Sequence, residues 1–387
     1  MHYDAIVVGA GPAGSSAAIQ LARNNCTVLL LEKSKHPRYK SCGGGISVRL
    51  RPYLDPDFFQ VVENSVNTLS IRYKDTQVVF SVERPFADLV RRERFDDYLV
   101  QKAKESGVEV LESSPVEAWR ETSKGIMVES RSGKDTADYL IAADGANSRI
   151  ARKLYPEWLR NQAPALEDTA PSGLNPATSK NTADSILLDL SVTQGYGWIF
   201  PKSETAAVGI GLFKGNKKHP RHEYADFKKR NMLPAASSAY AQGAILPLYQ
   251  KKRPKLVRGR VLLIGDAAAL LDPFFGEGIY YGVRSGQMAA QAVFEALHHG
   301  GEISAYHDAI AAIFYPEFEV ADRMARLIYT FPGFFLQTVR RYPGLMKTYA
   351  GVFQGEFGYC DFWKASRRRL FRKLNPFRRF SATSSQS

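Results

Sequence analysis

The sequence predicts an α/β protein with a parallel sheet, a second domain built on a β-sheet and a helical region at the C-terminus. Three observations support this prediction. Short continuous apolar runs such as Ala5–Val8 and Val261–Ile264 end directly at a glycine, as expected for buried parallel strands. Ser185–Val192 and Ala206–Phe213 have strand patterning. From Ile279 onward the pattern is mostly helical.

The predicted elements begin with a βαβ unit. The strand Ala5–Val8 leads into a helix at Ser15–Asn24, and a second buried strand follows at Thr27–Leu31. Farther along we expect a hairpin formed by Leu69–Tyr73 and Gln77–Val82. A helix should follow at Arg94–Glu105, and two more strands at Val108–Leu111 and Tyr139–Ala143. Residues 156–185 are rich in Pro, Ala, Ser, Thr and Asn without periodicity, which predicts a long loop or an insertion. The C-terminal helices should be interrupted at Pro332, Pro343 and Pro376.

A glycine-rich turn joins the first strand to the first helix. It has the pattern GxGxxG and comprises Gly9, Gly11, Pro12, Ala13 and Gly14. The first glycine permits the tight turn, the second lets the backbone approach a pyrophosphate, and the third allows the helix to pack closely on the strand. The N-terminus of the helix supplies amide donors and a favourable dipole for the same anion.

The acidic partner of this turn is Glu32, which ends the second strand 18 residues beyond Gly14 and is followed by Lys33. At this position a carboxylate can accept hydrogen bonds from the ribose hydroxyls of a dinucleotide. The acid also argues against a 2′-phosphate at this site, because two anions would repel each other. Turn, helix, strand and acid together predict a Rossmann-like FAD- or NAD(P)-binding domain.

Two later motifs each follow a buried strand. Asp144 and Gly145 begin a DGxxS motif, and Gly265 and Asp266 begin a GDAA motif. In the order GxGxxG, DGxxS and GDAA, the set resembles the flavoproteins built on the para-hydroxybenzoate hydroxylase fold. The resemblance implies FAD as the cofactor, with Asp266 near its ribityl chain and pyrophosphate.

The same resemblance implies roles for residues around the flavin. The segment that contains Gly276, Gly278 and Ile279 would pass the isoalloxazine with its backbone amides, and amides at a helix N-terminus stabilise negative charge on reduced flavin. Arg92 would reach the flavin from the helix after the hairpin, although its arginine-rich surroundings also fit a solvated helix start. The backbone of Val116 would meet the adenine.

Two further segments resemble the geranylgeranyl reductase family. One is the cysteine–glycine segment Lys40–Ser47, which includes Cys42 and Gly43. The other is a YxWxFP motif that begins at Tyr196 and includes Trp198. The resemblance covers most of the chain and is weakest over residues 156–185. It implies Cys42 and Gly43 as flavin neighbours and Cys42, Tyr196 and Trp198 as catalytic residues.

Tyr196, Trp198 and Phe200 should project from one face of a strand with period two. Such a face is either a flat wall for a hydrocarbon chain, able to stabilise cationic character by π interaction, or an ordinary sheet core. Cys42 also has two interpretations. It is a proton donor or redox-sensitive gate beside the reacting alkene, or a small buried residue.

The resemblance implies an enzyme that reduces isoprenoid double bonds. NADPH or a ferredoxin-type donor would reduce the FAD. The reduced FAD would deliver hydride to one carbon of the double bond, and a proton would add to the other carbon. The substrate would be a lipid, a prenyl diphosphate or a pigment side chain. An oxygen-using hydroxylase or halogenase on the same fold shares every FAD motif and stays open as an alternative. A non-catalytic membrane-binding protein with a vestigial flavin fold is a third.

We expect a discontinuous domain organisation in the chain of 387 residues. The FAD-binding domain would comprise residues 1–68, 84–155 and 257–300. An antiparallel-sheet domain for substrate would comprise residues 69–83 and 156–256. A helical region would follow over residues 301–365, and a basic tail over residues 366–387.

The positive charge of the chain is concentrated in that tail. The formal net charge is +13, and seven basic residues without an acid lie between Arg367 and Phe380, which leaves about +6 for the rest. Phe371 and Leu374 would share a helical face, giving either an interfacial segment that meets anionic lipid or a solvated terminus. No nucleic-acid module accompanies the charges, so we expect no nucleic-acid partner.

The cysteines Cys26, Cys42 and Cys360 show neither CxxC spacing nor a paired framework, which fits a reducing compartment, and we expect no metal site. The N-terminal segment lacks the basic start and long apolar stretch of a signal peptide. No apolar run approaches the ~20 residues that span a bilayer. We therefore expect a cytoplasmic protein, soluble or peripheral to a membrane, whose oligomeric state the sequence does not indicate.

Overall fold

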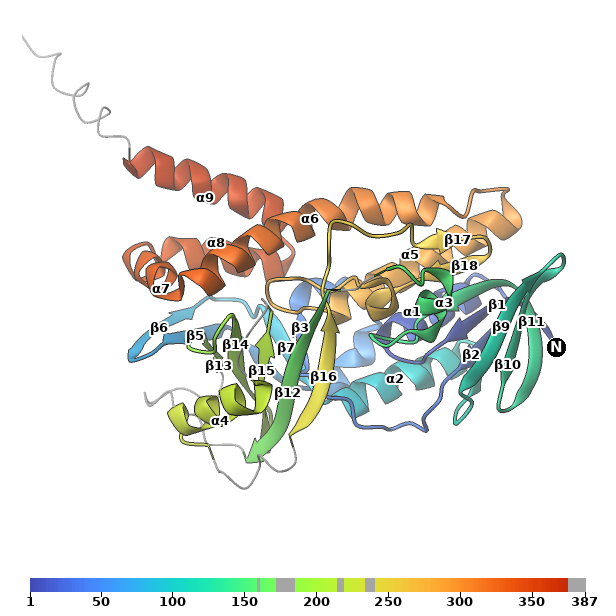
Figure 1. Cartoon of the computed structure of the whole chain (residues 1–387), viewed down its shortest axis with the longest axis horizontal. Coiled ribbons are helices and arrows are strands. Elements are labelled where there is room, and N and C mark those ends of the chain that lie inside the picture. The colour runs from blue at the N-terminus through green and yellow to red at the C-terminus, as the bar shows by residue number, and fades with distance from the viewer. Residues whose placement is uncertain (159–160, 172–184, 214–218, 234–240, 375–387) are drawn as a thin grey trace, which may run out of the picture.

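The computed structural model of the chain describes residues 1–158, 161–171, 185–213, 219–233 and 241–374. Two large sheets lie at opposite sides of the view in Figure 1, and the C-terminal helices gather over the second of them. The predicted architecture is confirmed: an α/β chain with a Rossmann-like domain, a sheet domain and a C-terminal helical region. The exact domain limits stay a prediction.

The first sheet contains eight strands among the described residues, in the order β17-β18-β11-β1-β2-β8, with β10 and β9 joined to β11. The strands are β1 (His2–Val8), β2 (Val28–Leu31), β8 (Glu109–Leu111), β9 (Val116–Thr122), β10 (Gly125–Ser130), β11 (Gly133–Ala142), β17 (Val257–Arg258) and β18 (Val261–Leu263). β1 pairs in parallel with β2 and β11, as expected for strands whose apolar residues run without alternation. The predicted βαβ unit is confirmed.

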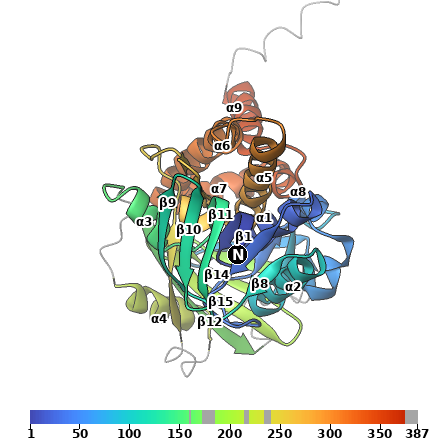
Figure 2. The ribbon, with the colours of Figure 1, turned by 90° about the vertical axis from the view of Figure 1, so that its right-hand side faces the viewer.

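Helices α1 (Pro12–Arg23), α2 (Arg92–Glu105) and α5 (Ile279–His298) belong to this domain, and α3 (Arg149–Leu154) follows β11. α1 and α5 pack very closely, because a Cβ atom added at Gly286 would lie only 2.3 Å from the carbonyl oxygen of Ala13. Figure 2 shows α5 directly above α1 and β1. The N-terminal halves of two helices that are far apart in the sequence therefore lie side by side.

The second sheet contains seven strands among the described residues, in the order β16-β12-β15-β14-β13-β5-β6. The strands are β5 (Thr68–Tyr73), β6 (Thr76–Ser81), β12 (Gln162–Pro171), β13 (Ser185–Asp189), β14 (Gly195–Pro201), β15 (Thr205–Leu212) and β16 (Gln242–Pro247). Neighbouring strands are antiparallel except β13 and β5, which are parallel. The predicted hairpin corresponds to β5 and β6.

The prediction of a loop over residues 156–185 is wrong for residues 162–171, which form β12. This strand is internal to the sheet, paired with β15 on one side and with the edge strand β16 on the other. Its partners are distant in sequence, and they satisfy its backbone although its own residues have weak strand propensity. Residues 172–184 lie outside the described part of the chain.

A small sheet joins the two domains. It consists of β3 (Gly45–Ser47), β7 (Ala87–Val90) and β4 (Val62–Val66), in the order β3-β7-β4. Two 3₁₀ segments, Val48–Tyr53 and Pro56–Val61, link β3 to β4. The sheet ties the cysteine–glycine segment, which leads into β3, to the strand that precedes α2.

The C-terminal region is helical, as predicted. It contains α6 (Ala305–Thr330), α7 (Pro332–Arg341), α8 (Gly344–Gln354) and α9 (Tyr359–Leu374), while α4 (Pro220–Arg230) lies on the other side of the second sheet (Figure 1). Pro332 begins α7 and Pro343 directly precedes α8, so both predicted interruptions are confirmed. Residues 366–374 of the predicted basic tail continue α9, although the structure describes no side chain beyond Ser366, and Pro376 lies outside the described residues.

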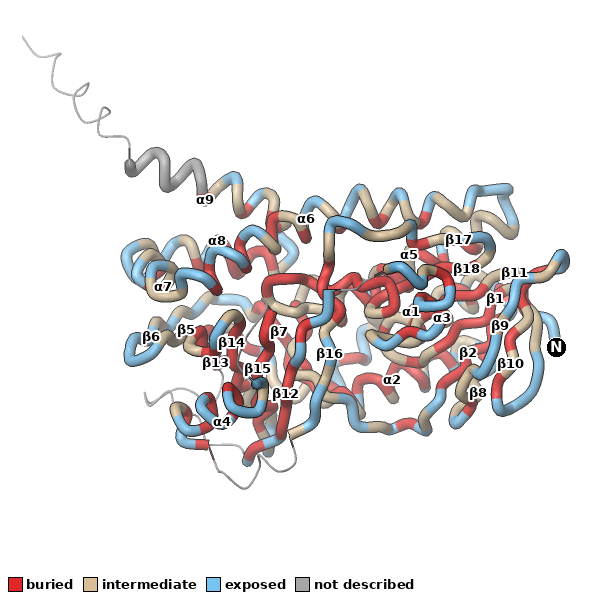
Figure 3. The backbone as a smooth tube through the Cα atoms, in the orientation of Figure 1, coloured by how far each residue is buried: buried red, intermediate tan, exposed pale blue. Residues whose placement is uncertain are grey.

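The apolar side chains form separate cores, one between the first sheet and its helices and another between the second sheet and α6–α9. Figure 3 shows the buried strands at the centre and exposed residues along the outer sides of α6 and α7. Among the described helices, none has the combination of length and apolar content needed to cross a bilayer. No group of His, Cys, Asp and Glu that could hold a metal ion occurs in the described part of the chain.

Candidate functional site

The three glycines of the first turn meet different surroundings. Gly9 has a φ of +103°, and a Cβ atom there would lie 2.4 Å from the carbonyl oxygen of Ala143. A Cβ atom at Gly14 would lie 1.9 Å from the carbonyl oxygen of Gly9. At Gly11, in contrast, the nearest described heavy atom would be 3.9 Å away, in the side chain of Arg38. Gly9 and Gly14 are therefore needed for folding, and Gly11 leaves space above the start of α1.

The carboxylate of Glu32 is buried at the end of β2, where the backbone amide of Ala10 donates to it (2.8 Å). Arg38 lies between two acids, 3.9 Å from Glu32 and 3.4 Å from Asp96. Its guanidinium is also the group nearest to the space at Gly11. Arg38 can thus face a pyrophosphate there. The sequence prediction missed Arg38 because its loop carries no recognisable spacing.

Lys33 and Val116 occupy different positions relative to Glu32. Lys33 is exposed. Val116 begins β9, two residues after Ser114, whose backbone amide donates to the carbonyl of Glu32 (2.8 Å). This contact brings the backbone around Val116 to the end of β2, where the adenosine end of a dinucleotide is expected.

The DGxxS motif forms the turn between β11 and α3. One carboxylate oxygen of Asp144 accepts hydrogen bonds from the amides of Arg149 (2.8 Å) and Ile150 (3.2 Å). Gly145 has a φ of +81°, and the Ser148 hydroxyl caps α3. The other oxygen of Asp144, Oδ1, is buried without a partner among the described residues. The motif is therefore structural and leaves one acceptor available.

The GDAA motif lies against the first turn of α1. Gly265 has a φ of +52°, and a Cβ atom there would lie 2.9 Å from the Cβ of Ala13. The carboxylate of Asp266 lies 3.5 Å from the position that a Cβ atom would take at Gly278, just before α5. Ile279, the first residue of α5, is buried. Neither α1 nor α5 has a side-chain cap among the described residues, so both helix starts offer amide donors at the same place.

The segment before α5 is held by a buried ion pair. Gly276 has a φ of +67°. The next residue, Glu277, accepts hydrogen bonds from the Ser47 hydroxyl and from Arg49, whose guanidinium lies 4.0 Å from the centroid of the Tyr280 ring. Burial alone would lower the pKa of Arg49, but the Glu277 carboxylate raises it well above its ordinary value. The sequence prediction did not identify this pair.

The cysteine–glycine segment packs against the predicted aromatic strand. A Cβ atom at Gly43 would lie 3.0 Å from the ring of Phe200 and 3.1 Å from Nε1 of Trp198. The rings of Tyr196 and Trp198 are 5.9 Å apart. Tyr196, Trp198 and Phe200 therefore share one face of β14, as predicted, and Trp198 Nε1 is buried without a partner among the described residues.

Tyr196 is fixed within this aromatic face. Its ring stacks on Phe213 at 5.3 Å, and its hydroxyl donates to the carbonyl of Phe275 (2.5 Å). Burial raises the pKa of Tyr196 above its ordinary value, so the hydroxyl stays protonated. The ring, rather than the hydroxyl, is the part of Tyr196 that is available to a substrate.

Arg92 lies at the start of α2 and is buried, so its interpretation as a solvated helix start is wrong. It forms two hydrogen bonds with Asp96, of 2.8 and 2.9 Å. Burial alone would lower the pKa of Arg92, but Asp96 and the neighbouring Cys42 thiol raise it above its ordinary value. The backbone amide of Gly44 also approaches the Cys42 sulfur (3.5 Å). A permanent cation thus accompanies Cys42.

Two further ionisable residues lie near Cys42 and were missed by the sequence prediction. Lys202 follows β14, and its Nζ would lie 3.2 Å from a Cβ atom at Gly44. Glu167 is buried on β12 and faces Lys202. Glu167 was missed because its strand was predicted to be a loop. Lys202 was missed because it directly follows the YxWxFP motif and belongs to no motif itself.

An apolar cavity of about 140 Å³ adjoins the aromatic face. It lies between the second sheet and α6–α9 and is lined by Ile71, Leu188, Leu190, Phe274, Phe275, Met324, Leu327, Ile328, Tyr329, Phe335, Thr338, Val339, Leu345, Met346, Tyr349, Phe362, Trp363 and Ser366. Two of these, Phe275 and Tyr329, also contact Tyr196, with ring centroids at 5.8 and 6.4 Å. Tyr196 thus does not line the cavity itself but contacts two residues that do, and the same face of β14 contacts the cysteine–glycine segment.

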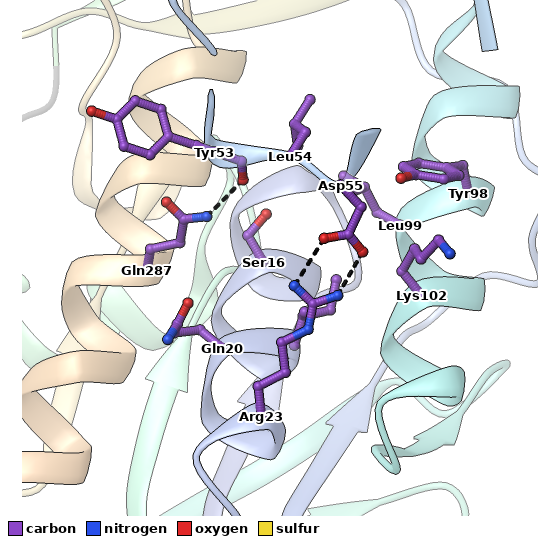
Figure 4. A pocket seen from close by; sticks show the side chains of 11 residues that line it. Ser16, Gln20, Arg23, Tyr53, Leu54, Asp55, Tyr98, Leu99, Lys102 and Gln287 are labelled. Atoms are coloured by element: carbon purple, nitrogen blue, oxygen red, sulfur yellow. Dashed lines mark hydrogen bonds and ion pairs between the residues drawn. The ribbon is translucent and has the colours of Figure 1, made fainter. Parts of the chain in front are cut away.

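A second cavity, of about 30 Å³, lies between α1, α2 and α5 on the other side of the first domain (Figure 4). Arg23 forms hydrogen bonds of 2.9 and 2.5 Å with Asp55 across it, and the Gln287 amide donates to the carbonyl of Tyr53 (2.9 Å). Its charged groups are thus paired, Lys102 with Asp57 and Glu105 outside the cavity, and the space holds about one or two water molecules. We assign it no part in the site.

The first domain matches the family model for FAD-dependent oxidoreductases over residues 4–145. The chain is 32% identical to geranylgeranyl diphosphate reductase of Rhodobacter capsulatus over 322 residues, which cover 78% of this chain and 77% of the relative. The chain belongs to the geranylgeranyl reductase family. It is thus an FAD-dependent oxidoreductase, and the resemblance inferred from its motifs is confirmed.

Solved structures agree on the fold of this geranylgeranyl reductase family member. A geranylgeranyl bacteriochlorophyll reductase-like protein from Thermoplasma acidophilum superposes with a TM-score of 0.71 at 24% identity, over 85% of this chain and 88% of that one. A flavin-dependent brominase superposes with a TM-score of 0.72 at 21% identity, over 96% of this chain and 100% of that one. The fold is therefore shared by flavoenzymes with different reactions.

The described residues fit FAD. The space at Gly11, the uncapped starts of α1 and α5 and the guanidinium of Arg38 suit a pyrophosphate. The unpaired Oδ1 of Asp144 and Nε1 of Trp198 provide an acceptor and a donor at separate points of the same region. When bound, the flavin supplies the hydride chemistry that no side chain of the protein can supply.

Proposed function

We propose that this enzyme reduces carbon–carbon double bonds in an isoprenoid chain of the geranylgeranyl type, attached to a diphosphate, a lipid or a pigment. The observation that carries the proposal is the apolar cavity whose lining residues Phe275 and Tyr329 contact the ring of Tyr196. Pockets that hold apolar ligands are mostly lined by aliphatic and aromatic side chains, as this one is. A hydrocarbon tail in the cavity would direct a double bond toward the Cys42–Gly43 segment.

The residues of the site divide the work in this proposal. Gly11, Glu32, Arg38 and the starts of α1 and α5 hold FAD. The rings of Tyr196 and Trp198 exclude water and stabilise positive character that develops on the alkene when hydride arrives. An isolated alkene also needs a positioned acid, and the Cys42 thiol beside Arg92 is our candidate.

The electron donor in this proposal is NADPH or a reduced ferredoxin. The sequence contains no second GxGxxG motif. A nicotinamide would therefore bind transiently at the flavin, without a Rossmann site of its own.

The proposal is tested by half-reactions. The purified flavoprotein is reduced anaerobically with dithionite and mixed with geranylgeranyl diphosphate. We expect the flavin to reoxidise and the product to gain two hydrogens per reduced double bond, measured by mass spectrometry. Leu345→Trp, which narrows the cavity from α8, should slow this reoxidation about tenfold without changing flavin content.

Retention of reduced flavin and an unchanged prenyl mass would contradict the reductase proposal. Oxygen uptake driven by NADPH with an aromatic substrate would instead favour the hydroxylase or halogenase alternative. A protein purified without flavin absorbance would support the non-catalytic alternative.

We also propose that the substrate enters from a membrane surface at the α6–α7 corner, defined by Leu327, Phe331 and Phe334. These side chains are 47%, 57% and 67% exposed, and Leu327 also lines the cavity, so the cavity reaches the surface there. Residues 331–354 contain three cations, Arg340, Arg341 and Lys347, and no acid. Exposed aromatic rings beside unopposed cations suit an anionic bilayer.

The double variant Phe331→Ser/Phe334→Ser should bind vesicles containing anionic lipid about tenfold more weakly than wild type, because two interfacial side chains are lost. Vesicle flotation measures this binding. Met232→Ser is the matched control, since Met232 is 71% exposed but follows α4 on the other side of the second sheet. Equal flotation of wild type and the double variant would exclude the α6–α7 corner as the membrane contact.

A further inference from the structure

A buried carboxylate lies beside the cysteine–glycine segment and has no part in holding FAD. Glu167, on the internal strand β12, is 4% exposed. Its Oε2 atom has no hydrogen-bond partner among the described residues. Burying a carboxylate oxygen without a hydrogen-bond partner costs free energy, so a protein that retains one needs a reason for it.

The position of Glu167 follows from the register of the second sheet. Glu167 lies opposite Gly209, and Gly209 lies opposite Trp198, so the three residues form one row across β12, β15 and β14. Residues directly opposite one another share a face of a sheet. A Cβ atom at Gly209 would lie 2.3 Å from the Trp198 ring, so the glycine makes room for that ring. Glu167 thus lies on the same side of the second sheet as the aromatic face of β14.

Glu167 connects this side of the sheet to solvent. The backbone amide of Cys42 donates to its carboxylate, and the side chains of Lys202 and Arg92 are close enough to act on its charge. The hydroxyl of Tyr39 also forms a hydrogen bond with it, and Tyr39 is 47% exposed. Glu167 therefore contacts both the hydroxyl of Tyr39, which is near the surface, and the backbone of Cys42, where a carboxyl group can pass a proton.

We propose that Glu167 is a proton relay that reloads Cys42 during alkene reduction; this inference rests on the proposed function. The Cys42 S–H bond breaks as a C–H bond forms at the alkene carbon opposite the one that receives hydride. The thiolate that remains lies beside Arg92. The O–H bond of protonated Glu167 then breaks, the S–H bond reforms, and Tyr39 passes a proton from water to the Glu167 carboxylate. The net reaction consumes one hydride and one proton from solvent for each double bond.

The protonation of Glu167 suits this role at neutral pH. Burial raises the pKa of Glu167 to about 7, although the Cys42 amide, Lys202, Arg92 and Tyr39 act in the opposite direction. Burial also lowers the pKa of Lys202, against the effect of Glu167, Cys42, Glu93 and Glu63. Because the relay needs protonated Glu167, its contribution is present below about pH 7 and is lost as the pH rises through that value.

The test is Glu167→Gln, with Asp168→Asn as the matched control because Asp168 is the neighbouring carboxylate on the opposite face of β12. The enzyme is mixed anaerobically with geranylgeranyl diphosphate and an excess of dithionite between pH 5.5 and 9, so that the flavin is reduced again after each turnover. Wild type and Asp168→Asn should show repeated turnover that falls above about pH 7. Glu167→Gln should be about tenfold slower at pH 6.5 and lack this inflection. An inflection near pH 7 that survives in Glu167→Gln would overturn the relay.

An infrared difference titration of the holoenzyme without substrate keeps this inference separate from the proposed function. Wild type should lose a carboxylic-acid C=O band as the pH rises through about 7, and Glu167→Gln should lack that band. If prenyl substrates never reoxidise the wild-type flavin, the proposed function fails while the titration still reports the proton on Glu167. Absence of the band from wild type at pH 6 would overturn the relay whatever the substrate.

Discussion

Gly11→Ala is expected to yield a folded protein whose affinity for FAD is about 100-fold lower, which is about 2.8 kcal/mol of binding free energy. The added Cβ atom would lie 3.9 Å from its nearest described neighbour, in Arg38, so folding tolerates it. The same atom would occupy the space through which a pyrophosphate approaches the backbone before α1. Fluorescence titration of the apoprotein with FAD measures the affinity, and thermal unfolding of the apoprotein checks the fold.

Gly14→Ala is the matched comparison, because there the Cβ atom would lie 1.9 Å from the carbonyl oxygen of Gly9. This variant should lose stability as well as FAD. If Gly11→Ala binds FAD within about threefold of wild type, the pyrophosphate does not lie over Gly11, and our assignment of the glycine turn is wrong.

Arg49→Met should lower the free energy of unfolding by about 3–5 kcal/mol, because it leaves Glu277 buried without its cation. The side chains of Arg49 and Glu277 are only 10% and 6% exposed, so water cannot replace the partner. Loss of the ion pair should also make the Gly276–Gly278 segment less ordered and thereby lower the affinity for the flavin. Urea unfolding at pH 7 measures the first effect, and flavin release during gel filtration measures the second.

The double variant Arg49→Met/Glu277→Gln separates loss of the pair from loss of packing. Removing both charges should restore more than half of the stability that Arg49→Met loses, since an unpaired buried charge is the main cost. A change below about 1 kcal/mol in Arg49→Met alone would mean that Glu277 finds water or another partner, contrary to the buried geometry.

Local patterns were sufficient where function requires a particular backbone conformation. Gly9, Gly14 and Gly265 are glycines because any side chain would collide with neighbouring backbone or helix, and such constraints are visible in sequence as motifs. The period-two pattern likewise predicted that Tyr196 and Trp198 share a face of β14.

Residues whose importance depends on distant partners were not predictable in this way. Arg38 is positioned by its ion pair with Asp96, and Arg49 by its ion pair with Glu277, which is 228 positions away in sequence. Glu167 was hidden because β12 has weak strand character and is held by β15 and β16. No local spacing records such pairings.

By itself, the sequence determined a dinucleotide site, because glycine turns and strand-end acids are short-range requirements of binding a dinucleotide. Its later motifs indicated FAD and the geranylgeranyl reductase family by resemblance. Only the tertiary structure decided what surrounds Cys42. It buries Arg92 and Glu167 beside that residue and leaves an apolar cavity near Tyr196. These features depend on the packing of α2, β12 and α6–α9 against one another, which no segment of the sequence specifies alone.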